Sequence, residues 1–307
     1  DRFNARLMFP IQNEKGNIIG FGGRILKADK KQAKYLNTPE TSIYHKSKVL
    51  YGYFQAKKSI SSTKLVNVVE GYTDCTTMHD KGLTNTVASC GTAFTDDQIK
   101  MLKKRCETMR FLFDSDEAGI NAARKAIQRL VHEENLHPQI CILPKGEDPD
   151  SIFKSESYKE FEKIQIKLYK SKKEDVNEFE LNENFISSFA IDGIEWYVND
   201  LFRGADSIVQ KSKALKAAED FISLIPDEVL QTTYINQFKK LFGVAPSEIK
   251  KRVQAIKVDR LKKLNDDEGE TNKIKWPKGS EPLDYENWGF VQVQKNQSKL
   301  TGYHFPK

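Results

Sequence analysis

Six carboxylates lie at or shortly after the ends of short, mostly apolar runs that are typical of buried β-strands. Glu70 follows the run at 65–69, and Asp114 and Asp116 follow a second run at 109–113. Because parallel strands present their carboxyl ends at one edge of a sheet, where ligands bind, we expect these acids to converge there. Asp74 in a turn and two aspartates in a proline-rich loop add to these acids. The candidate metal-binding residues are Glu70, Asp74, Asp114, Asp116, Asp148 and Asp150.

Carboxylate oxygens are hard ligands, and Mg2+ or Mn2+ is the cation that such a set suits. Carboxylates packed together without a cation would raise one another's pKa, so a divalent ion is their natural neutraliser. Bound metal ions of this kind support phosphoryl transfer without a covalent enzyme intermediate. A single aspartate at a strand end is ordinary capping chemistry. A glutamate ending one strand and an Asp-x-Asp ending another favour metal binding.

The elements that must position these acids alternate between strand and helix. Such alternation predicts a mostly parallel sheet flanked by helices, because parallel strands need a crossover connection. The helix after 109–113 begins at the acids, and its free backbone N–H groups would favour an anion nearby. The expected strands are 65–69, 86–89, 109–113 and 139–143, and the expected helices are 75–81, 96–106 and 117–132.

The first 58 residues are basic, with 12 Lys and Arg against 4 Asp and Glu, a net charge of +8 by subtraction. A β-hairpin is expected there, with strands at 6–11 and 18–21 around the turn at 13–17. Gly22-Gly23-Arg24 indicates either a tight bend or the close approach of a backbone or ligand. The loop-like stretch 30–52 interleaves cations with tyrosines, which suits phosphate contact and base stacking and is also found in solvated loops.

The remaining chain indicates helices and linkers. Residues 167–180 are charge-rich and poorly periodic, whereas apolar residues recur at helical spacing from Asn184 to Ala255. The predicted divisions are an amino-terminal basic β part at 1–64, an α/β core at 65–165, a charged linker at 166–183, a helical subdomain at 184–265, and a linker with a truncated tail at 266–307.

Composition limits the classes of protein that the chain could belong to. Of its 307 residues 38% are hydrophobic and 30% charged, and no apolar run reaches the roughly 18 residues that span a membrane. We expect a cytoplasmic protein without a membrane partner, and a fragment, since the chain does not begin with Met. No P-loop or zinc spacing is present. The cysteines are singly spaced and expected to be reduced: Cys75, Cys90, Cys106 and Cys141.

Four motifs in order, EGYTD, ASCGTAFT, FDSDEAG and GEDPD, resemble the Toprim core of bacterial and phage DnaG-type DNA primases. Upstream, RLMFPI, GFGGR and KYLNTPETSIYHKSKVLYG resemble the preceding part of the same RNA polymerase domain. The resemblance covers residues 1 to about 165. It implies an α/β fold with a Toprim core, preceded by part of a mixed β basic subdomain and followed by the helical subdomain that closes the polymerase domain.

The resemblance also implies activity and partners. Template-directed synthesis of short RNA primers would use Glu70, Asp114 and Asp116 as catalytic acids, with the other three supporting metal or nucleotide. The implied partners are a single-stranded DNA template, ribonucleotide triphosphates, the RNA–DNA hybrid and a replicative helicase, separate or fused. Zinc is implied only for an amino-terminal domain that this chain lacks. The implied nucleotide- and nucleic-acid-binding residues are Arg24, Lys34, Tyr35, Asn37 and Lys46.

Two other functions fit parts of the sequence. Toprim motifs also occur in nucleases and topoisomerases, although a topoisomerase needs a nucleophilic tyrosine in a DNA-cleavage context that the helical segment does not provide. An inactive scaffold would bind single strands with salt-dependent affinity and would bind no divalent metal. Cutting of labelled DNA with Mn2+ separates the first alternative from synthesis.

Overall fold

The computed structural model describes residues 2–27, 32–91, 94–172 and 175–271, and of 264–271 only the backbone. The chain divides into two compact units, Asp1–Ile256 and Lys257–Lys307. The first unit contains a three-stranded sheet, a five-stranded sheet and most of the helices. All the candidate site residues lie in this first unit.

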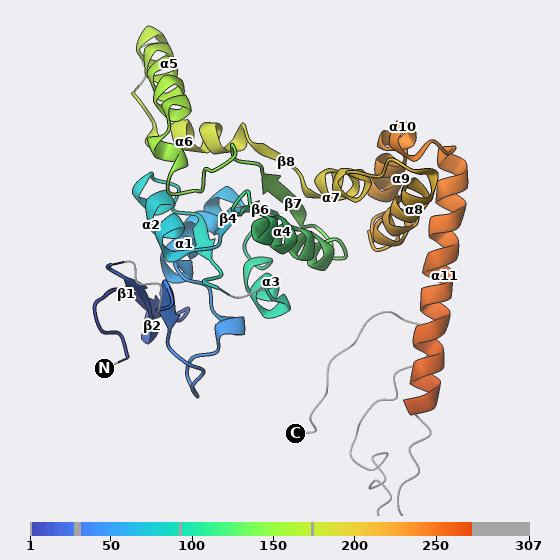
Figure 1. Cartoon of the computed structure of the whole chain (residues 1–307), viewed down its shortest axis with the longest axis horizontal. Helices are drawn as coiled ribbons and strands as arrows, with labels where there is room; N and C mark the ends of the chain where they lie inside the picture. Colours follow the sequence, from blue (N-terminus) through green and yellow to red (C-terminus); the bar gives the residue numbers. More distant parts are fainter. Residues whose placement is uncertain (1, 28–31, 92–93, 173–174, 272–307) are drawn as a thin grey trace, which may run out of the picture. The chain divides into compact units, whose positions relative to one another are not determined.

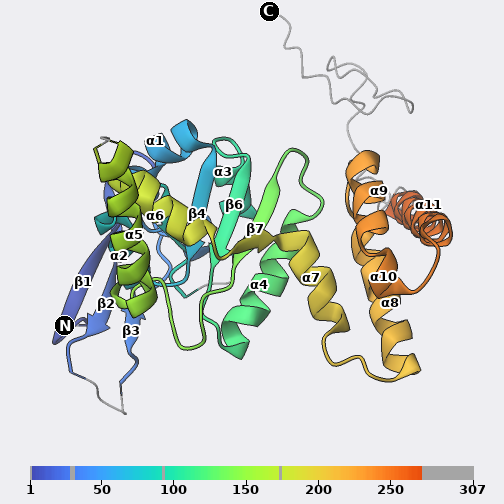
Figure 2. The ribbon, with the colours of Figure 1, turned by 90° about the horizontal axis from the view of Figure 1, so that it is seen from above.

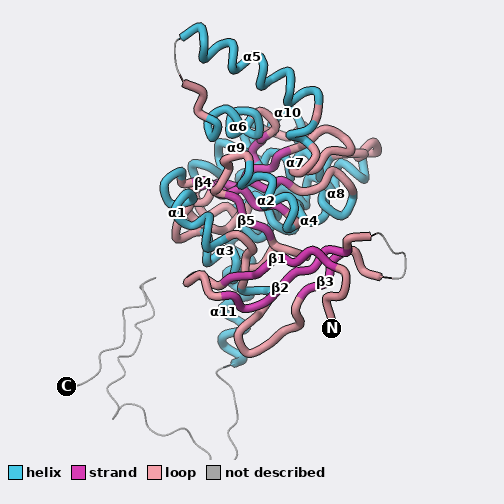
Figure 3. Tube along the Cα trace, turned by 90° about the vertical axis from the view of Figure 1, so that its left-hand side faces the viewer, coloured by secondary structure: helices cyan, strands magenta, loops and turns pink. Residues whose placement is uncertain are grey.

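The amino-terminal sheet is antiparallel, in the order β1-β2-β3, and confirms the predicted hairpin (Figure 3). Its strands are β1 (Arg6–Gln12), β2 (Ile18–Ile25) and β3 (Tyr35–Asn37). The expectation of a loop at 30–52 is wrong in part, because β3 and a 3-10 turn, η1 (Lys46–Lys48), lie within it. Helix α1 (Tyr53–Thr63), which was not predicted, buries Tyr53, Ala56 and Ile60.

The larger sheet has the order β5-β4-β6-β7-β8, and its first four strands are parallel. These strands are β4 (Leu65–Val69), β5 (Thr86–Ala88), β6 (Thr108–Leu112) and β7 (His137–Cys141). Figure 2 shows β4, β6 and β7 side by side. The α/β prediction is confirmed, with helices α2 (Tyr72–Asp80), α3 (Asp96–Leu102) and α4 (Glu117–Leu130) between the strands. The expectation that β7 is the last strand is wrong. The three-residue β8 (Ala190–Asp192), too short for a pattern, pairs antiparallel with it.

Successive side chains of these strands point to opposite faces of the sheet and belong to two separate hydrophobic cores. Val66, Val68 and Phe111 belong to the first core, which includes residues of α1, α3, α4 and α7 (Gly193–Phe202). Val69 and Leu112 belong to the second core, with residues of α2 and α6 (Glu178–Ser187). Helices therefore cover both faces, which fixes the strand ends that carry the acids (Figure 1).

The expected charged linker at 166–183 is wrong over most of its length. After η2 (Ile152–Lys154), helix α5 (Glu156–Lys172) runs through its first part, and α6 begins at Glu178. Tyr158, Phe161 and Phe185 pack together in the second core, so a few widely spaced apolar residues hold these charge-rich helices. Residues 173–174 lie outside the described part of the chain.

Helices dominate after residue 192, as predicted. They are α7, α8 (Ile208–Ile222), α9 (Glu228–Gln237), α10 (Lys239–Phe242) and α11 (Pro246–Thr271). Gly243 ends α10 with φ +63°, and Pro246 begins α11, so these two residues punctuate the chain as expected. The linker expected from residue 266 is helical up to Thr271, and the remaining tail lies outside the described residues. The finer domain boundaries stay a prediction.

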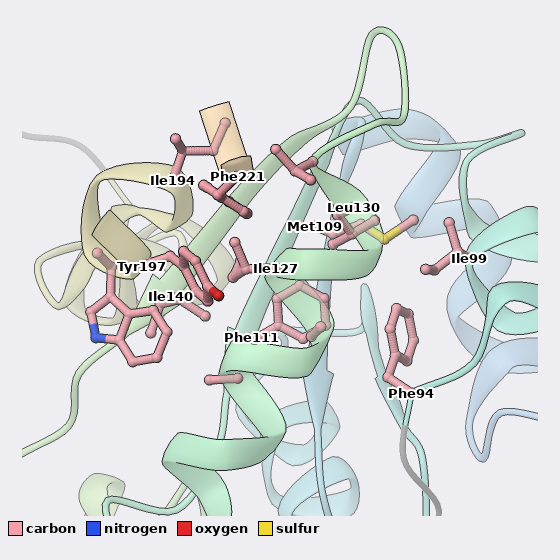
Figure 4. Packing of buried hydrophobic residues seen from close by; sticks show 14 of the residues in the cluster. Phe94, Ile99, Met109, Phe111, Ile127, Leu130, Ile140, Ile194, Tyr197 and Phe221 are labelled. Atoms are coloured by element: carbon pink, nitrogen blue, oxygen red, sulfur yellow. The ribbon is translucent and has the colours of Figure 1, made fainter. Parts of the chain in front are cut away.

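The first core is continuous from the sheet into these helices. Tyr197 of α7 and Phe221 of α8 have ring centroids 4.2 Å apart, and Figure 4 shows both beside Ile127 of α4. Ile194 and Leu130 belong to the same core. Helix α7 thus packs against the sheet and α4, and α8 packs on α7.

The four cysteines lie within the described residues and differ in burial. Cys75, Cys106 and Cys141 are buried, Cys90 is half-buried, and all four are free thiols. Burial raises the pKa of Cys106 and of Cys141 to about 12, which makes both thiols poor nucleophiles. Across the described residues, no helix combines the length and the apolar character that a membrane span requires.

Candidate functional site

The first acid, Glu70, directly follows β4, and the structure brings it beside the end of the neighbouring strand β6. The backbone N–H of Asp114 donates to Glu70 Oε1 over 3.4 Å. Burial is the main cause that raises the pKa of Glu70 to about 7, and the Asp114 carboxylate adds to it. A carboxylate held this way binds a proton or a cation near neutral pH.

Asp74 comes to the same edge from the first turn of α2. Its Oδ2 accepts the backbone N–H of Gly71 over 2.9 Å, so the carboxylate is oriented by the turn that follows Glu70. Burial is the main cause that raises the pKa of Asp74 to about 6, and repulsion from Asp148 and Asp114 raises it further. The hydrogen bond from Gly71 acts in the opposite direction.

Asp114 and Asp116 lie between β6 and α4 and have different surroundings. Asp116 is the exposed N-cap of α4, and its Oδ1 accepts the backbone N–H of Gly119 over 2.8 Å. Asp114 is half-buried, and burial followed by the charge of Asp148 raises its pKa. A Cβ on Gly119 would lie 2.1 Å from the Asp114 carbonyl oxygen, so only glycine permits this tight approach.

The proline-rich loop after β7 supplies the other two acids. Asp148 Oδ1 accepts the backbone N–H groups of Asp150 over 3.0 Å and of Ser151 over 2.7 Å. Asp150 accepts a hydrogen bond from the Thr77 hydroxyl and forms an ion pair with Lys154 at 3.2 Å. The hydrogen bond from Thr77, with Lys154, lowers the pKa of Asp150. Asp150 is therefore held by the protein itself.

The donor set suits a hard divalent cation. Glu70, Asp74 and Asp114 all have raised pKa values that a nearby cation would lower, and carboxylate oxygen is the ligand that Mg2+ prefers. Across the part of the chain that the structure describes, no three Asp, Glu, His or Cys side chains are arranged to hold an ion as they stand. The acids share one edge without forming a ready-made cage.

Two cations, one in the small sheet and one directly before its strand β3, face this edge. The Lys34 ammonium lowers the pKa of Asp114, and Arg24 lowers that of Asp150. Both cations also lie over the Tyr35 ring, with Arg24 Cζ 5.8 Å and Lys34 Nζ 5.9 Å from its centroid. Burial is the largest cause of the raised Asp114 pKa, so Lys34 offsets only part of that rise.

Asn37 is occupied by contacts within the protein. Its Oδ1 accepts the Tyr72 hydroxyl over 2.9 Å, and its Nδ2 donates to the Cys90 carbonyl over 3.0 Å. The Tyr72 ring fills the space beside Gly22, where a Cβ would lie 2.3 Å from Tyr72 Cζ. Gly22 thus admits an aromatic side chain of the protein, and Asn37 joins β3 to α2 and to the segment after β5.

Lys46 lies in η1, and hydrogen bonds to its backbone N–H and carbonyl groups hold it in place. Its N–H donates to Glu40 Oε1 over 3.0 Å, and its carbonyl accepts Gln98 Nε2 over 3.4 Å. The described structure gives no contact between the Lys46 side chain and the acids. His45, also in this basic stretch, pairs with Glu40 at 3.1 Å.

Three residues that the sequence did not single out support the edge. Thr77 orients Asp150, Gly119 permits the turn at Asp114, and Thr73 Oγ1 lies 3.2 Å from the Tyr35 hydroxyl. Thr73 and Thr77 lie on α2 in and just beyond the EGYTD motif, and Gly119 closes FDSDEAG. The contacts of Thr73 and Thr77 join segments far apart in the sequence, so only their place in or beside the motif could have indicated these two residues.

Three family models match consecutive parts of the chain. Residues 1–57 match the amino-terminal domain of the DNA primase catalytic core, and residues 67–153 match a Toprim-like domain. Residues 194–247 match a domain described as the DnaB-helicase binding domain of primase. This description differs from our expectation for these helices, that they close the polymerase domain, which stays a prediction.

Curated relatives include the DNA primase of Pseudomonas putida, 32% identical over 256 residues, which are 83% of this chain and 36% of the relative. The DNA primase of Escherichia coli is 39% identical over 164 residues, 53% of this chain and 28% of the relative. The chain therefore spans about a third of the length of these relatives.

Solved structures of primase catalytic domains are also similar to this chain. The Escherichia coli primase catalytic core has a TM-score of 0.64 at 30% identity and covers 80% of this chain, which covers 72% of it. A DNA primase domain from Pseudomonas aeruginosa has a TM-score of 0.66 at 29% identity, covering 83% and 73%. A DnaG primase catalytic domain bound to single-stranded DNA has a TM-score of 0.65 at 30% identity, covering 81% and 72%.

Proposed function

The chain belongs to the family of bacterial DnaG-type DNA primases, and we propose that it synthesises short RNA primers on a single-stranded DNA template. One observation carries this proposal. An acidic edge, built from the ends of β4 and β6, is faced by two cations, Arg24 of β2 and Lys34 just before β3. Acids that suit a divalent cation, beside cations that suit phosphate, fit nucleotidyl transfer.

The acids are proposed to hold the metal, with Glu70, Asp114 and Asp116 as the catalytic residues. Bound Mg2+ or Mn2+ would activate the attacking 3' hydroxyl and stabilise the leaving pyrophosphate. Glu70 and Asp114 supply ligand oxygens from adjacent strands, and their backbone contact keeps them together. Asp74 and Asp148 extend the negative edge, while Asp150 is restrained by Thr77 and Lys154.

The basic sheet is proposed to bind the incoming ribonucleotide triphosphate and the template. Lys34 and Arg24 lie where their charges reach the acids, so a triphosphate bound between them would have cations on the protein side. Tyr35 offers a ring for stacking. Asn37 is proposed to act by holding β3 against α2, since both ends of its amide are engaged.

A primer-synthesis assay on the purified chain tests the function. With a single-stranded template, ribonucleotides and Mg2+ or Mn2+, we expect labelled products that alkali degrades and that depend on both template and metal. Cleavage of labelled DNA without such products would favour the nuclease alternative. Template binding that is unaffected by a chelator, with no products at all, would favour the inactive scaffold.

The helicase partner is proposed from the match of residues 194–247 to a helicase-binding domain. We infer that these helices bind a DnaB-type replicative helicase, so that primers are made beside the DNA that the helicase has opened. Such a protein would work in the cytoplasm.

The charge of Lys34 gives a prediction. Replacing Lys34 by alanine should raise the apparent KM for ribonucleotide about tenfold, because a hydrogen bond to a charged group contributes about 1.5 kcal/mol. The dependence of activity on Mg2+ concentration should change less. The comparison is Lys58→Ala, which removes the same charge from an exposed position on α1. Equal KM values for both variants would contradict the role of Lys34.

A further inference from the structure

A groove of about 890 Å³ lies at the sheet edge opposite to the acids. Thr108 and His137, the first residues of β6 and β7, line it, whereas Asp114 lies beyond the other end of β6. A strand rises about 3.3 Å per residue, so the groove and Asp114 are separated by roughly 20 Å. A molecule bound in this groove would leave the acidic edge open.

The groove has walls from two parts of the fold. One wall comes from the Toprim part, through the end of α4 and the β7 entrance, and the other comes from α7 and the turn between α8 and α9. Leu130, Ile194 and Ile225 are almost fully buried members of the first core, and Figure 4 shows Leu130 and Ile194 within it. The groove is therefore set in packed, well-defined structure.

Apolar side chains remain exposed at the α9 side. Leu230 lines the groove and is 42% exposed, and the adjacent Val229 is 77% exposed. Exposed valine and leucine on consecutive positions of a helix are available for burial by a partner. Both residues fall inside the segment that matches the helicase-binding domain of primases.

The polar lining is acidic. Glu107 and Glu134 are exposed, Glu133 pairs with Lys103 at 2.7 Å, and Asp227 caps α9 through the backbone N–H of Val229. Within the described residues, no lysine or arginine lines the groove. This charge repels the phosphates of a nucleic acid and attracts a cationic protein segment.

We propose that this groove binds a basic, amphipathic segment of the replicative helicase. The proposal rests on the helicase partner given under the proposed function and adds where and by what chemistry it binds. Lysine or arginine side chains of that segment would face Glu107 and Glu134, and its apolar face would cover Leu230 and Val229. The charge and the apolar rim together select this occupant over a nucleic acid strand.

Charge reversal in the full chain tests the proposal. In titrations of the labelled chain with a purified DnaB-type helicase, the double variant Glu107→Lys/Glu134→Lys should raise the Kd at least tenfold. Leu230→Ser should weaken binding several-fold without any change of charge. The matched control, Glu160→Lys/Asp206→Lys, makes the same charge change at exposed positions outside the groove, Asp206 lying within the matched segment. Its Kd should stay within twofold of wild type.

Each other outcome is informative. Unchanged binding in both groove variants, while wild type binds, overturns the groove and leaves the helicase partner standing. If the wild-type chain does not bind helicase, both the groove and the helicase partner are overturned. Primer synthesis measured without helicase still tests the catalytic proposal by itself, and the groove variants should retain that activity. If the chain dimerises and the groove variants do not, the groove binds a second copy of the chain. If the groove variants lose affinity for the template, the groove binds DNA. Either result overturns the proposal.

Discussion

Replacing Glu70 by glutamine is expected to lower primer synthesis roughly a thousandfold. The change keeps the size of the side chain and removes the negative charge at the edge where β4 meets β6. Metal stabilisation of a transition state contributes several kcal/mol, and each 1.36 kcal/mol is a factor of ten in rate. Initial rates of dinucleotide formation, measured at saturating template over a range of Mg2+ concentrations, would show this loss.

The same variant should gain stability when divalent ions are absent, which separates lost chemistry from lost folding. Burial and Asp114 raise the pKa of Glu70 from 4.5 to about 7 in the folded protein. Ionising this group therefore disfavours the folded state, so the free energy of unfolding falls as pH rises from about 4.5 to about 7. Glutamine cannot ionise, and the Tm of Glu70→Gln should exceed that of wild type at pH 8 but not at pH 4.5.

Divalent ions should reverse this order. Mg2+ or Mn2+ binding to the folded wild type should raise its Tm more than that of Glu70→Gln. If Glu70→Gln retains wild-type primer synthesis, Glu70 is not a catalytic acid. If added Mg2+ shifts both Tm values equally, Glu70 is not a metal ligand, whatever its effect on the rate.

Replacing Gly119 by alanine is expected to abolish primer synthesis through displacement of Asp114. The added Cβ would lie 2.1 Å from the Asp114 carbonyl oxygen, and the backbone of Asp114 cannot move without moving its carboxylate. The same turn holds the bond from the Gly119 N–H to Asp116 Oδ1. Overpacking of this kind costs about 1–3 kcal/mol of stability, although alanine by itself favours a helix over glycine.

Gly20→Ala is the matched control, because a Cβ at Gly20 would meet its nearest neighbours, Thr38 and Tyr44, at 3.4 Å. Its Tm and its rate of primer synthesis should stay near wild type. Gly119→Ala should lose Mg2+-dependent stabilisation together with activity, as judged by Tm with and without the ion. A Gly119→Ala variant with normal activity would show that the position of Asp114 is not critical.

The sequence by itself determined the parallel part of the larger sheet and the residue types of its acidic edge. The short, mostly apolar runs at 65–69 and 109–113 are local signals, and each is followed by a carboxylate, so the strands and the acids could be predicted together. The helices that follow these strands also carry local signals, including the cap residue Asp116. The sequence predicts a linker where α5 and α6 lie, because the few apolar residues of these helices are spread among many charges.

The relationships between distant segments were decided only by the tertiary structure. Thr77 and Asp150 are 73 residues apart, and the pairing of Asn37 with Tyr72 joins β3 to α2. The local sequence around each of these residues does not indicate its hydrogen-bond partner, because such a bond needs only a donor and an acceptor that packing brings together. The raised pKa of Glu70 likewise arises from burial and from Asp114, which the fold supplies. The sequence therefore named the chemical groups, and the packing of strands and helices set their protonation, their neighbours and their distances.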